Sequence, residues 1–438
     1  MQIELIKTIE AGQNGGECLH FYDIDSDGQK ELIFRQSSGL LGREDERNSP
    51  CMDDEDNLYL LCYTCFKQDG SMLWQFGKPW LKDKPYRNHG EPNLTAIFDI
   101  NSDGKPELVY RHKKRIFIRD IQTTELLAEF QLPNDDVNKI VPQKVGDDFN
   151  IITLGYKQVL AYSSDFQLLW EIHGDDEYNA FRFADIDNDG KDELFIAGSL
   201  YDHDGSLIWQ LDHESHVDFV NVSDINDDGE LEVLYTLCGR DFLILDKDSK
   251  ELFRDTSFTH PQVFLVGNFM PEVPGSQIFI TEKASVGGSI MMDYKGNRLW
   301  EYPCNGYCML ASGNENQADM IIHSPSPGRM SQELQEKYLA KASSLGYEDL
   351  PIQSGDPSDP IVLSGNGKIL TRFPKLESDK PVNLDECLKM WNLDVRIPGD
   401  FGLTYNIIVD DIDQDGKNEW IAHNRRKVWI FKPNEMKL

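Results

Sequence analysis

The sequence predicts an all-β protein in which eight four-stranded sheets are arranged radially as a β-propeller. Three observations support this prediction. A nine-residue acidic motif occurs five times, a hairpin-like motif occurs seven times, and together they divide the 438 residues into eight units of about 55 residues. Repeats of this length, each with its own strand and turn signals, are typical of propeller blades.

The acidic motif reads D-x-[DN]-x-D-G-x-x-E and stands between two apolar stretches in every copy. The copies begin at Asp23, Asp99, Asp185, Asp224 and Asp411. Each copy predicts a strand, a tight turn and a second strand, because the flanking stretches have strand composition. The glycine suits a turn position with an unusual backbone angle.

The hairpin-like motif, as in QDGSMLWQF and HDGSLIWQL, predicts the turn and the last strand of a blade. Three units keep this hairpin but have lost the acidic turn, and their replacement segments begin at Val145, Val266 and Ala311. The last unit ends after a third strand, KVWIFKP, so residues 2–9 are expected to add the fourth strand and close the ring. Eight blades are predicted, with seven as the alternative because degenerate units are easily miscounted.

The composition is that of a folded, strongly acidic chain. It has 43 Lys and Arg against 76 Asp and Glu, a formal net charge of −33, and 39% hydrophobic residues. Such a charge repels nucleic-acid phosphates and attracts cations. No apolar run is long enough to span a membrane, and the first residues carry no secretory signal. We expect no nucleic-acid or membrane partner, and a cytoplasmic location as the sequence stands, or a secreted or periplasmic one if a signal was removed.

The chain is expected to form a single domain over residues 1–438 and to be a monomer, because a closed propeller needs no partner to cover its sheet edges. Its eight cysteines are irregularly spaced and are predicted to be reduced. Cys62 and Cys65 lie three apart in one strand-like run. They would therefore point to opposite faces and are interpreted as core residues, not metal ligands.

The acidic motif resembles the FG-GAP/VCBS calcium-loop repeats of integrin α-subunit propellers and of several secreted bacterial propellers. Among enzymes, the chain looks most like the eight-bladed catalytic domain of rhamnogalacturonan lyases and is similar in outline to related uronate-polysaccharide lyases. The resemblance covers nearly the whole chain through D-x-D-x-D-G-x-x-E. It implies the fold and the ion but says little about function.

Oxygen ligands at alternate positions of a tight loop suit a hard cation, which favours Ca²⁺ over Zn²⁺. The resemblance implies side-chain ligands at motif positions 1, 3, 5 and 9, a backbone carbonyl at position 7, and several structural ions. The alternative is a solvated acidic hairpin in which Asp only forms the turn. The implied ligands are Asp23, Asp25, Asp27, Gln29 and Glu31; Asp99, Asn101, Asp103, Lys105 and Glu107; Asp185, Asp187, Asp189, Lys191 and Glu193; Asp224, Asn226, Asp228, Glu230 and Glu232; and Asp411, Asp413, Asp415, Lys417 and Glu419.

Four long insertions are predicted on the face of the disc opposite the acidic turns. They cover residues 36–56 in the first unit, 76–92 before the second, 325–360 in the seventh and 375–403 before the eighth. Units 7, 8, 1 and 2 are neighbours in a closed ring, so the insertions gather in one sector. This is expected of a site built from loops on a rigid scaffold.

The same face is expected to collect cationic side chains at strand exits, among them Arg35, Arg111 and Arg425. A basic patch on a strongly acidic protein should concentrate an anionic ligand, and Arg binds carboxylates in a bidentate manner. The substrate class that this predicts is an anionic, uronate-containing glycan.

These features predict a polysaccharide or oligosaccharide lyase that cleaves next to a uronic acid by β-elimination. The reaction needs a neutralised C6 carboxylate, a base for the C5 proton and an acid for the leaving oxygen. A non-catalytic, calcium-stabilised propeller that binds a glycan or a protein on its loop face is the alternative. The lyase hypothesis assigns His89 as base and Tyr86 as proton donor, places Arg87, Arg111 and Arg425 on the carboxylate, and keeps His20 and His423 as further candidates for the base.

Overall fold

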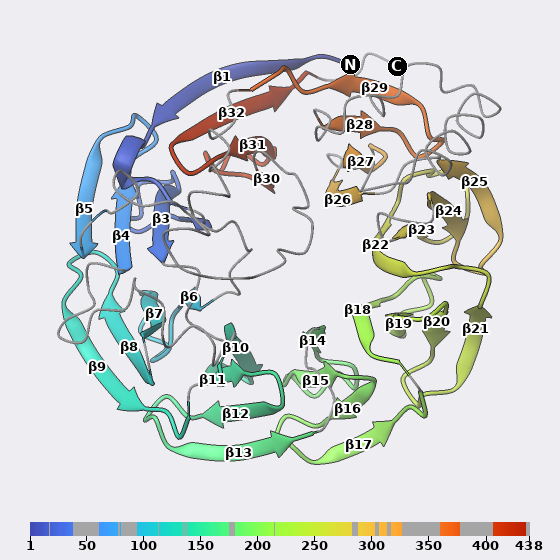
Figure 1. Cartoon of the computed structure of the whole chain (residues 1–438), viewed down its shortest axis with the longest axis horizontal. Helices are drawn as coiled ribbons and strands as arrows, with labels where there is room; N and C mark the ends of the chain where they lie inside the picture. The colour runs from blue at the N-terminus through green and yellow to red at the C-terminus, as the bar shows by residue number, and fades with distance from the viewer. Residues whose placement is uncertain are drawn as a thin grey trace, which may run out of the picture.

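The computed structural model describes residues 1–16, 18–37, 61–77, 79, 94–112, 114–134, 136–137, 139–174, 180–213, 215–282, 288–302, 306–312, 317–325, 360–376 and 406–434. Its 32 strands form eight four-stranded antiparallel sheets. The sheets surround a common axis as the blades of a propeller (Figure 1). The prediction of eight blades is confirmed, and the seven-blade alternative is wrong.

Each blade runs from an innermost first strand to an outermost fourth strand. Blade 1 contains β2 (Cys18–Tyr22), β3 (Glu31–Ser37), β4 (Leu61–Phe66) and β5 (Met72–Gly77). Blade 2 contains β6 (Thr95–Phe98), β7 (Glu107–His112), β8 (Arg115–Asp120) and β9 (Leu126–Gln131). Blade 3 contains β10 (Lys139–Val145), β11 (Asp148–Leu154), β12 (Gln158–Tyr162) and β13 (Leu168–His173). Blade 4 contains β14 (Phe181–Ala184), β15 (Glu193–Ile196), β16 (Ser199–Tyr201) and β17 (Leu207–Gln210).

The second half of the ring repeats this plan. Blade 5 contains β18 (Val217–Ser223), β19 (Glu232–Leu237), β20 (Phe242–Leu245) and β21 (Glu251–Asp255). Blade 6 contains β22 (Pro261–Gly267), β23 (Gln277–Glu282), β24 (Ser289–Asp293) and β25 (Arg298–Tyr302). Blade 7 contains β26 (Gly306–Ala311), β27 (Met320–Pro325), β28 (Ile361–Leu363) and β29 (Ile369–Arg372). Blade 8 contains β30 (Asn406–Asp410), β31 (Glu419–His423), β32 (Lys427–Pro433) and the N-terminal β1 (Ile3–Glu10).

The ring closes by pairing the two ends of the chain. β1 lies antiparallel to β32, from Ile3 opposite Pro433 to Glu10 opposite Lys427. β1 lies on the outside of this blade, next to β32 (Figure 1). The predicted closing strand is confirmed, one residue later than expected.

The core consists of apolar layers between neighbouring blades. β12 and β19 are buried along their whole length, because the preceding blade covers one face of each sheet and the following blade covers the other. One such layer joins Leu234 and Phe242 of blade 5 to Phe264 and Ile278 of blade 6. Each fully buried side chain of this size contributes about 1.5–3 kcal/mol to folding. This continuous burial explains why the middle strands read as unbroken apolar runs.

Two further features concern the described residues. The buried Cys62 and Cys65 form no disulfide bond, as predicted for reduced core residues. The short 3-10 helix η1 (Gly12–Asn14) is their one helical segment, so they hold no helix long enough to cross a membrane.

The strand order gives the disc two different faces. The connections between first and second strands and between third and fourth strands lie on one face, here named the acidic face because it carries the five acidic turns. All other connections lie on the opposite face, here named the insertion face. The four insertions leave and re-enter the sheets there, at β3 and β4, β5 and β6, β27 and β28, and β29 and β30. Most of their residues lie outside the described part of the chain.

Candidate functional site

The five acidic turns share one backbone conformation. The sixth residue of each, always glycine, has φ between 84 and 88°. This confirms the predicted glycine role. The fourth residue is also left-handed although it is never glycine, with φ between 53 and 64°, a conformation that destabilises a residue with a side chain by about 1–2 kcal/mol. These fourth residues are Ser26, Ser102, Asn188, Asp227 and Gln414.

Side-chain carboxylates hold each turn in this shape. In blade 1, Asp23 accepts hydrogen bonds from the backbone N–H groups of Asp27 at 3.1 Å and Gly28 at 3.0 Å. Asp27 accepts one from the N–H of Gln29 at 2.9 Å. The other four turns repeat the pattern. The side chains at positions 1 and 5 therefore accept the backbone hydrogen bonds that define the turn.

The closing glutamate is buried in every copy. Its Oε2 accepts a hydrogen bond from the N–H of the second motif residue, as from Ile186 to Glu193 at 2.9 Å. The other oxygen of Glu193, Oε1, is buried and has no hydrogen-bond partner among the described residues. Leaving a buried acceptor unsatisfied destabilises a protein by about 1–3 kcal/mol. A cation beside Oε1 would remove this penalty.

The donor atoms in three turns are close enough together for a shared ion. One ligand atom from each member of a triplet lies within 4.8 Å of the others. All are carboxylate oxygens, the ligands that Ca²⁺ prefers. The residues present therefore fit the predicted ion. The triplets are Asp23, Asp25 and Asp27; Asp185, Asp187 and Glu193; and Asp411, Asp413 and Glu419.

The five turns differ in the residue that the third strand places opposite the closing glutamate. In blades 1 and 8 this residue is a lysine. Lys67 Nζ lies 2.7 Å from Asp25 and 3.2 Å from Asp27, and Lys432 Nζ lies 2.8 Å from both Asp413 and Asp415. Blades 2, 4 and 5 have an aspartate instead, namely Asp120, Asp202 and Asp246. Sequence reasoning missed this difference, because the residue lies far from the motif along the chain.

Burial raises the pKa of all five closing glutamates. Burial raises the pKa of Glu107 and of Glu193 to about 7, and the neighbouring aspartates add to the effect. Burial also raises the pKa of Glu419, but Lys432 opposes this shift. A positive group near the glutamate therefore counteracts the effect of burial on its pKa.

On the insertion face, the structure brings two of the predicted histidines together at the seam between blades 8 and 1. His20 lies on β2 and is partly exposed, whereas His423 ends β31 and is buried. The ring of Phe34 meets the ring of His423 edge-on at 6.5 Å. Burial and the charge of Arg35 lower the pKa of His20 to about 4. Burial lowers the pKa of His423 to about 4, so both imidazoles are neutral at pH 7.

The arginines of this seam are positioned by two glycines. A Cβ on Gly15 would collide with the carbonyl of Arg425, and one on Gly16 would collide with the carbonyl of Arg35. Residues 15–16 therefore pass between β3 and the turn after β31, with one arginine on each side. Gln36 secures this segment by donating hydrogen bonds to the carbonyls of Gln13 and Gly15. Arg35 is fully buried, and Arg425 is partly exposed.

The other predicted catalytic residues are placed differently. Arg111 is buried in β7, and its Nη1 donates a hydrogen bond to the carbonyl of Val137 at 2.7 Å. This contact ties Arg111 to the connection between blades 2 and 3. His89, Tyr86 and Arg87 lie outside the described residues, in the connection between β5 and β6.

Comparison with known proteins identifies the fold. The sequence matches no family model and no curated protein. The structure is similar to the exotype rhamnogalacturonan lyase YesX, with a TM-score of 0.63 and 14% identity over 95% of this chain and 72% of that one. It is also similar to the rhamnogalacturonan lyase YesW, with a TM-score of 0.58 and 14% identity over 97% and 73% of the two chains. The V. cholerae biofilm matrix protein Bap1 matches with a TM-score of 0.58 and 11% identity over 97% and 88%. At these identities the likeness establishes the β-propeller fold alone.

Proposed function

We propose that this protein is a polysaccharide lyase that cleaves a glycan next to a uronic acid by β-elimination. The observation that carries the proposal is the seam of blades 8 and 1, where two neutral imidazoles lie beside a buried arginine. The four insertions leave the sheets of blades 7, 8, 1 and 2 on the same face of the disc. The fold likeness to two rhamnogalacturonan lyases supports the same assignment.

The proposed reaction removes the proton on C5 of the uronate. The electron pair forms the C4–C5 double bond, the bond from C4 to the glycosidic oxygen breaks, and that oxygen takes up a proton. An arginine beside the C6 carboxylate stabilises the carbanion-like transition state. In this proposal Arg425 and Arg87 bind the carboxylate, His89 takes the proton and Tyr86 supplies one.

His20 is the alternative base that the described residues favour. It is neutral at pH 7, partly exposed and next to Arg35. His423 is also neutral, but it is 3% exposed and packs against Phe34, which places it behind the surface. This buried position suits a residue that orients neighbouring side chains more than one that contacts a substrate.

Calcium is proposed to stabilise the propeller from the acidic face. Asp185, Asp187 and Glu193 would hold one ion in blade 4, where it would offset the local negative charge and bind the buried Oε1 of Glu193. Binding to the folded chain alone would raise stability by about 2.7 kcal/mol per site at a hundredfold excess over Kd.

The test is ultraviolet absorbance during incubation of the calcium-loaded protein with rhamnogalacturonan, glucuronate-capped gums and ulvan. We expect absorbance to rise as the unsaturated uronate forms. The rise should be abolished in His89→Ala and reduced in Arg425→Ala. His173→Ala, which changes an exposed histidine on the outermost strand of blade 3, is the matched control and should remain active.

Two other outcomes are informative. Activity that survives His89→Ala but is lost in His20→Ala would keep the lyase and move the base to β2. A flat trace over the whole panel, with folded protein, would contradict the lyase. It would favour a non-catalytic propeller that binds a glycan or protein, an alternative supported by the fold likeness to the biofilm matrix protein Bap1.

A further inference from the structure

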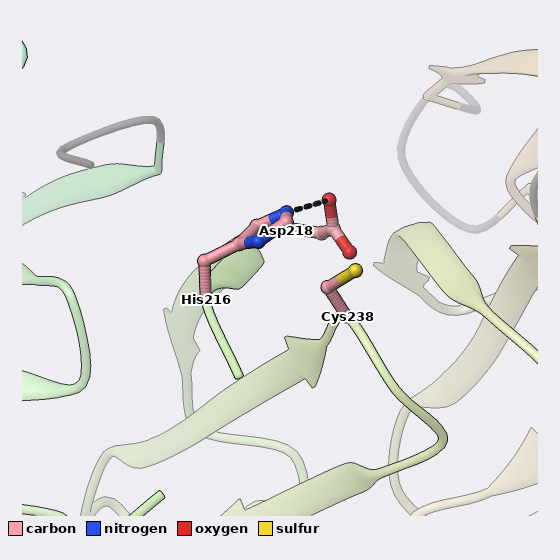
Figure 2. Close-up of side chains that lie close together, drawn as sticks. All are labelled: His216, Asp218 and Cys238. Carbon is pink, nitrogen blue, oxygen red and sulfur yellow. Dashed lines mark ion pairs between the residues drawn. The ribbon is translucent and has the colours of Figure 1, made fainter. Parts of the chain in front are cut away.

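A second cluster of metal-ligating side chains lies on blades 5 and 6, across the ring from the seam of blades 8 and 1 (Figure 1). His216 precedes β18, Asp218 is the second residue of β18, and Cys238 directly follows β19. Figure 2 shows the three side chains converging. His216 Nε2 lies 3.4 Å from Asp218 Oδ1, and one ligand atom from each residue lies within 4.8 Å of the other two. The cluster lies on the insertion face.

The backbone is adapted to aim Asp218 into this cluster. The pairing of β18 with β19 shifts between Val217 and Phe219, which leaves Asp218 as the extra residue of a β-bulge. Bulges redirect a side chain and are common beside functional sites. A second bulge lies in β22 at Gln262, whose Nε2 donates a hydrogen bond to Asp218 Oδ1 at 2.8 Å. Irregularities in both blades therefore fix one carboxylate.

His260, just before β22, completes the arrangement from blade 6. Its Nε2 lies 3.1 Å from Asp218 Oδ2, and its Nδ1 lies 3.8 Å from Cys238 Sγ. Metal ligands are commonly oriented by a neighbouring group of this kind. The Asp218 side chain is 8% exposed, whereas that of His216 is 43% exposed. The cluster is therefore buried at Asp218 and open to solvent at His216.

We propose that His216, Asp218 and Cys238 bind a transition-metal ion, Zn²⁺, with His260 orienting Asp218 and Cys238. Zn²⁺ takes imidazole nitrogen, thiolate sulfur and carboxylate oxygen, and tetrahedral bonds of about 2.0–2.3 Å place its ligand atoms about 3.3–3.6 Å apart. The distance between His216 and Asp218 already has this value. Binding releases the thiol proton of Cys238 to solvent.

The ligand set separates this site from the acidic turns. Nitrogen and sulfur ligands select zinc-like ions, whereas the motif residues of the acidic turns offer oxygen and suit calcium. In blade 4 the imidazole of His203 also lies close to Glu193 and Asp202, but no thiol does. Three protein ligands leave the fourth position on the exposed side for water or another small ligand, as in zinc sites that act on substrates.

The experiment titrates the full chain, saturated with Ca²⁺ to occupy the turns, with Zn²⁺ and separately with Co²⁺. We expect one Zn²⁺ per chain, and with Co²⁺ a near-ultraviolet absorption band from sulfur-to-cobalt charge transfer. Cys238→Ser should remove the band and weaken Zn²⁺ binding by at least about 100-fold, and His260→Ala should weaken it by about 10- to 100-fold.

Two variants control for folding and for adventitious thiol binding. His216→Ala changes a largely exposed side chain, so it should lose Zn²⁺ affinity while keeping the circular dichroism spectrum and the melting temperature of the metal-free protein. Cys18→Ser, which changes a partly buried cysteine of blade 1, should bind Zn²⁺ normally.

Either of two results would overturn the proposal. One is the absence of Zn²⁺ binding at micromolar concentration by the calcium-saturated protein, and the other is a cobalt band that persists in Cys238→Ser. Alkylation of Cys238, followed by peptide mass, gives a third readout. Zn²⁺ should protect the thiol, and rapid alkylation unchanged by Zn²⁺ would instead assign Cys238, His260 and Asp218 to a reactive-thiol site.

Discussion

The acidic turns of blades 1 and 8 and those of blades 2, 4 and 5 share a motif and a backbone shape, yet they differ electrostatically. In blades 1 and 8, Lys67 and Lys432 place an ammonium group between the carboxylates at motif positions 3 and 5. In blades 2, 4 and 5 the corresponding side chain is a further carboxylate, Asp120, Asp202 or Asp246. The first group of turns is partly neutralised by this lysine, whereas the second group gains a carboxylate at the same position. In blade 4 a lysine of the motif, Lys191, lies 3.4 Å from Asp189 instead.

This difference indicates that the nine-residue motif alone does not determine how tightly a turn binds a metal ion. An opposite charge within about 4 Å favours the ionised carboxylate without any external ion. The turns of blades 2, 4 and 5 have no lysine at this position, so we expect them to bind calcium more tightly than the turns of blades 1 and 8.

Removing calcium is expected to have the largest effect. With EGTA, the melting temperature should fall, since each occupied site contributes about 2.7 kcal/mol at a hundredfold excess over Kd. Hydrogen exchange should speed up at the turns of blades 2, 4 and 5 and change little at those of blades 1 and 8. An equal change in all five turns would contradict the comparison.

Exchanging the residue opposite the closing glutamate should exchange the calcium affinities of the two groups of turns. Asp202→Lys places an ammonium group beside Asp187 and Glu193 and should reduce the calcium bound per chain by one ion in isothermal titration calorimetry. Lys432→Ala should increase the affinity of the blade 8 turn, because three carboxylates lose their lysine partner. Asp204→Ala, which changes an exposed carboxylate in the same blade 4 connection as Asp202, is the control.

The pH dependence of the metal-free protein should separate the two groups by a smaller amount. The folded-state pKa of Glu193 is about 7 against an ordinary value of 4.5, so the folded state binds the proton more tightly than the unfolded state. The resulting stability is present below pH 4.5 and is lost as the pH rises towards 7.

The measurement is the melting temperature in EGTA between pH 4.5 and 7.5, expressed as the difference between wild type and variant. Glu193→Gln should flatten the pH dependence clearly, and Glu419→Gln should flatten it less because Lys432 opposes the shift of Glu419. Equal effects of the two substitutions would contradict the proposed role of the lysine.

The smallest expected effect concerns the left-handed fourth residue of each turn. Ser26→Gly should stabilise blade 1 by up to about 1 kcal/mol by removing the steric penalty of a side chain at φ 60°. Asn188→Gly should be nearly neutral, because asparagine tolerates this conformation. Urea unfolding of the two variants measures the difference, and a larger gain for Asn188→Gly would contradict the explanation.

The sequence was sufficient for the architecture because its signals are local. Most blades can be recognised from a glycine turn and the apolar strands within a few residues of it. The closing strand was predicted because the last unit lacked a fourth strand. The charge opposite Glu31 or Glu193 comes from the next strand, from Lys67 or Asp202, and depends on the register of the pairing. No spacing rule reveals it.

The candidate sites show the same limit. His20 and His423 were both proposed as bases, but only the ring closure brings these two ends of the chain together. Arg111 is buried within β7, and the sequence could not show that its guanidinium donates to the carbonyl of Val137. The cluster around Asp218 was missed because a bulge aims the carboxylate and its partners come from separate segments.

The pairing of β1 with β32 also determines when the ring can close during synthesis. Glu10 is made about 400 residues before its partner Lys427. At translation rates of about 5–20 residues per second, the first strand waits roughly 20–80 s for its neighbour. Until then its edge is an unpaired template for other strands, so the nascent chain is most exposed to misassociation just before the ring closes.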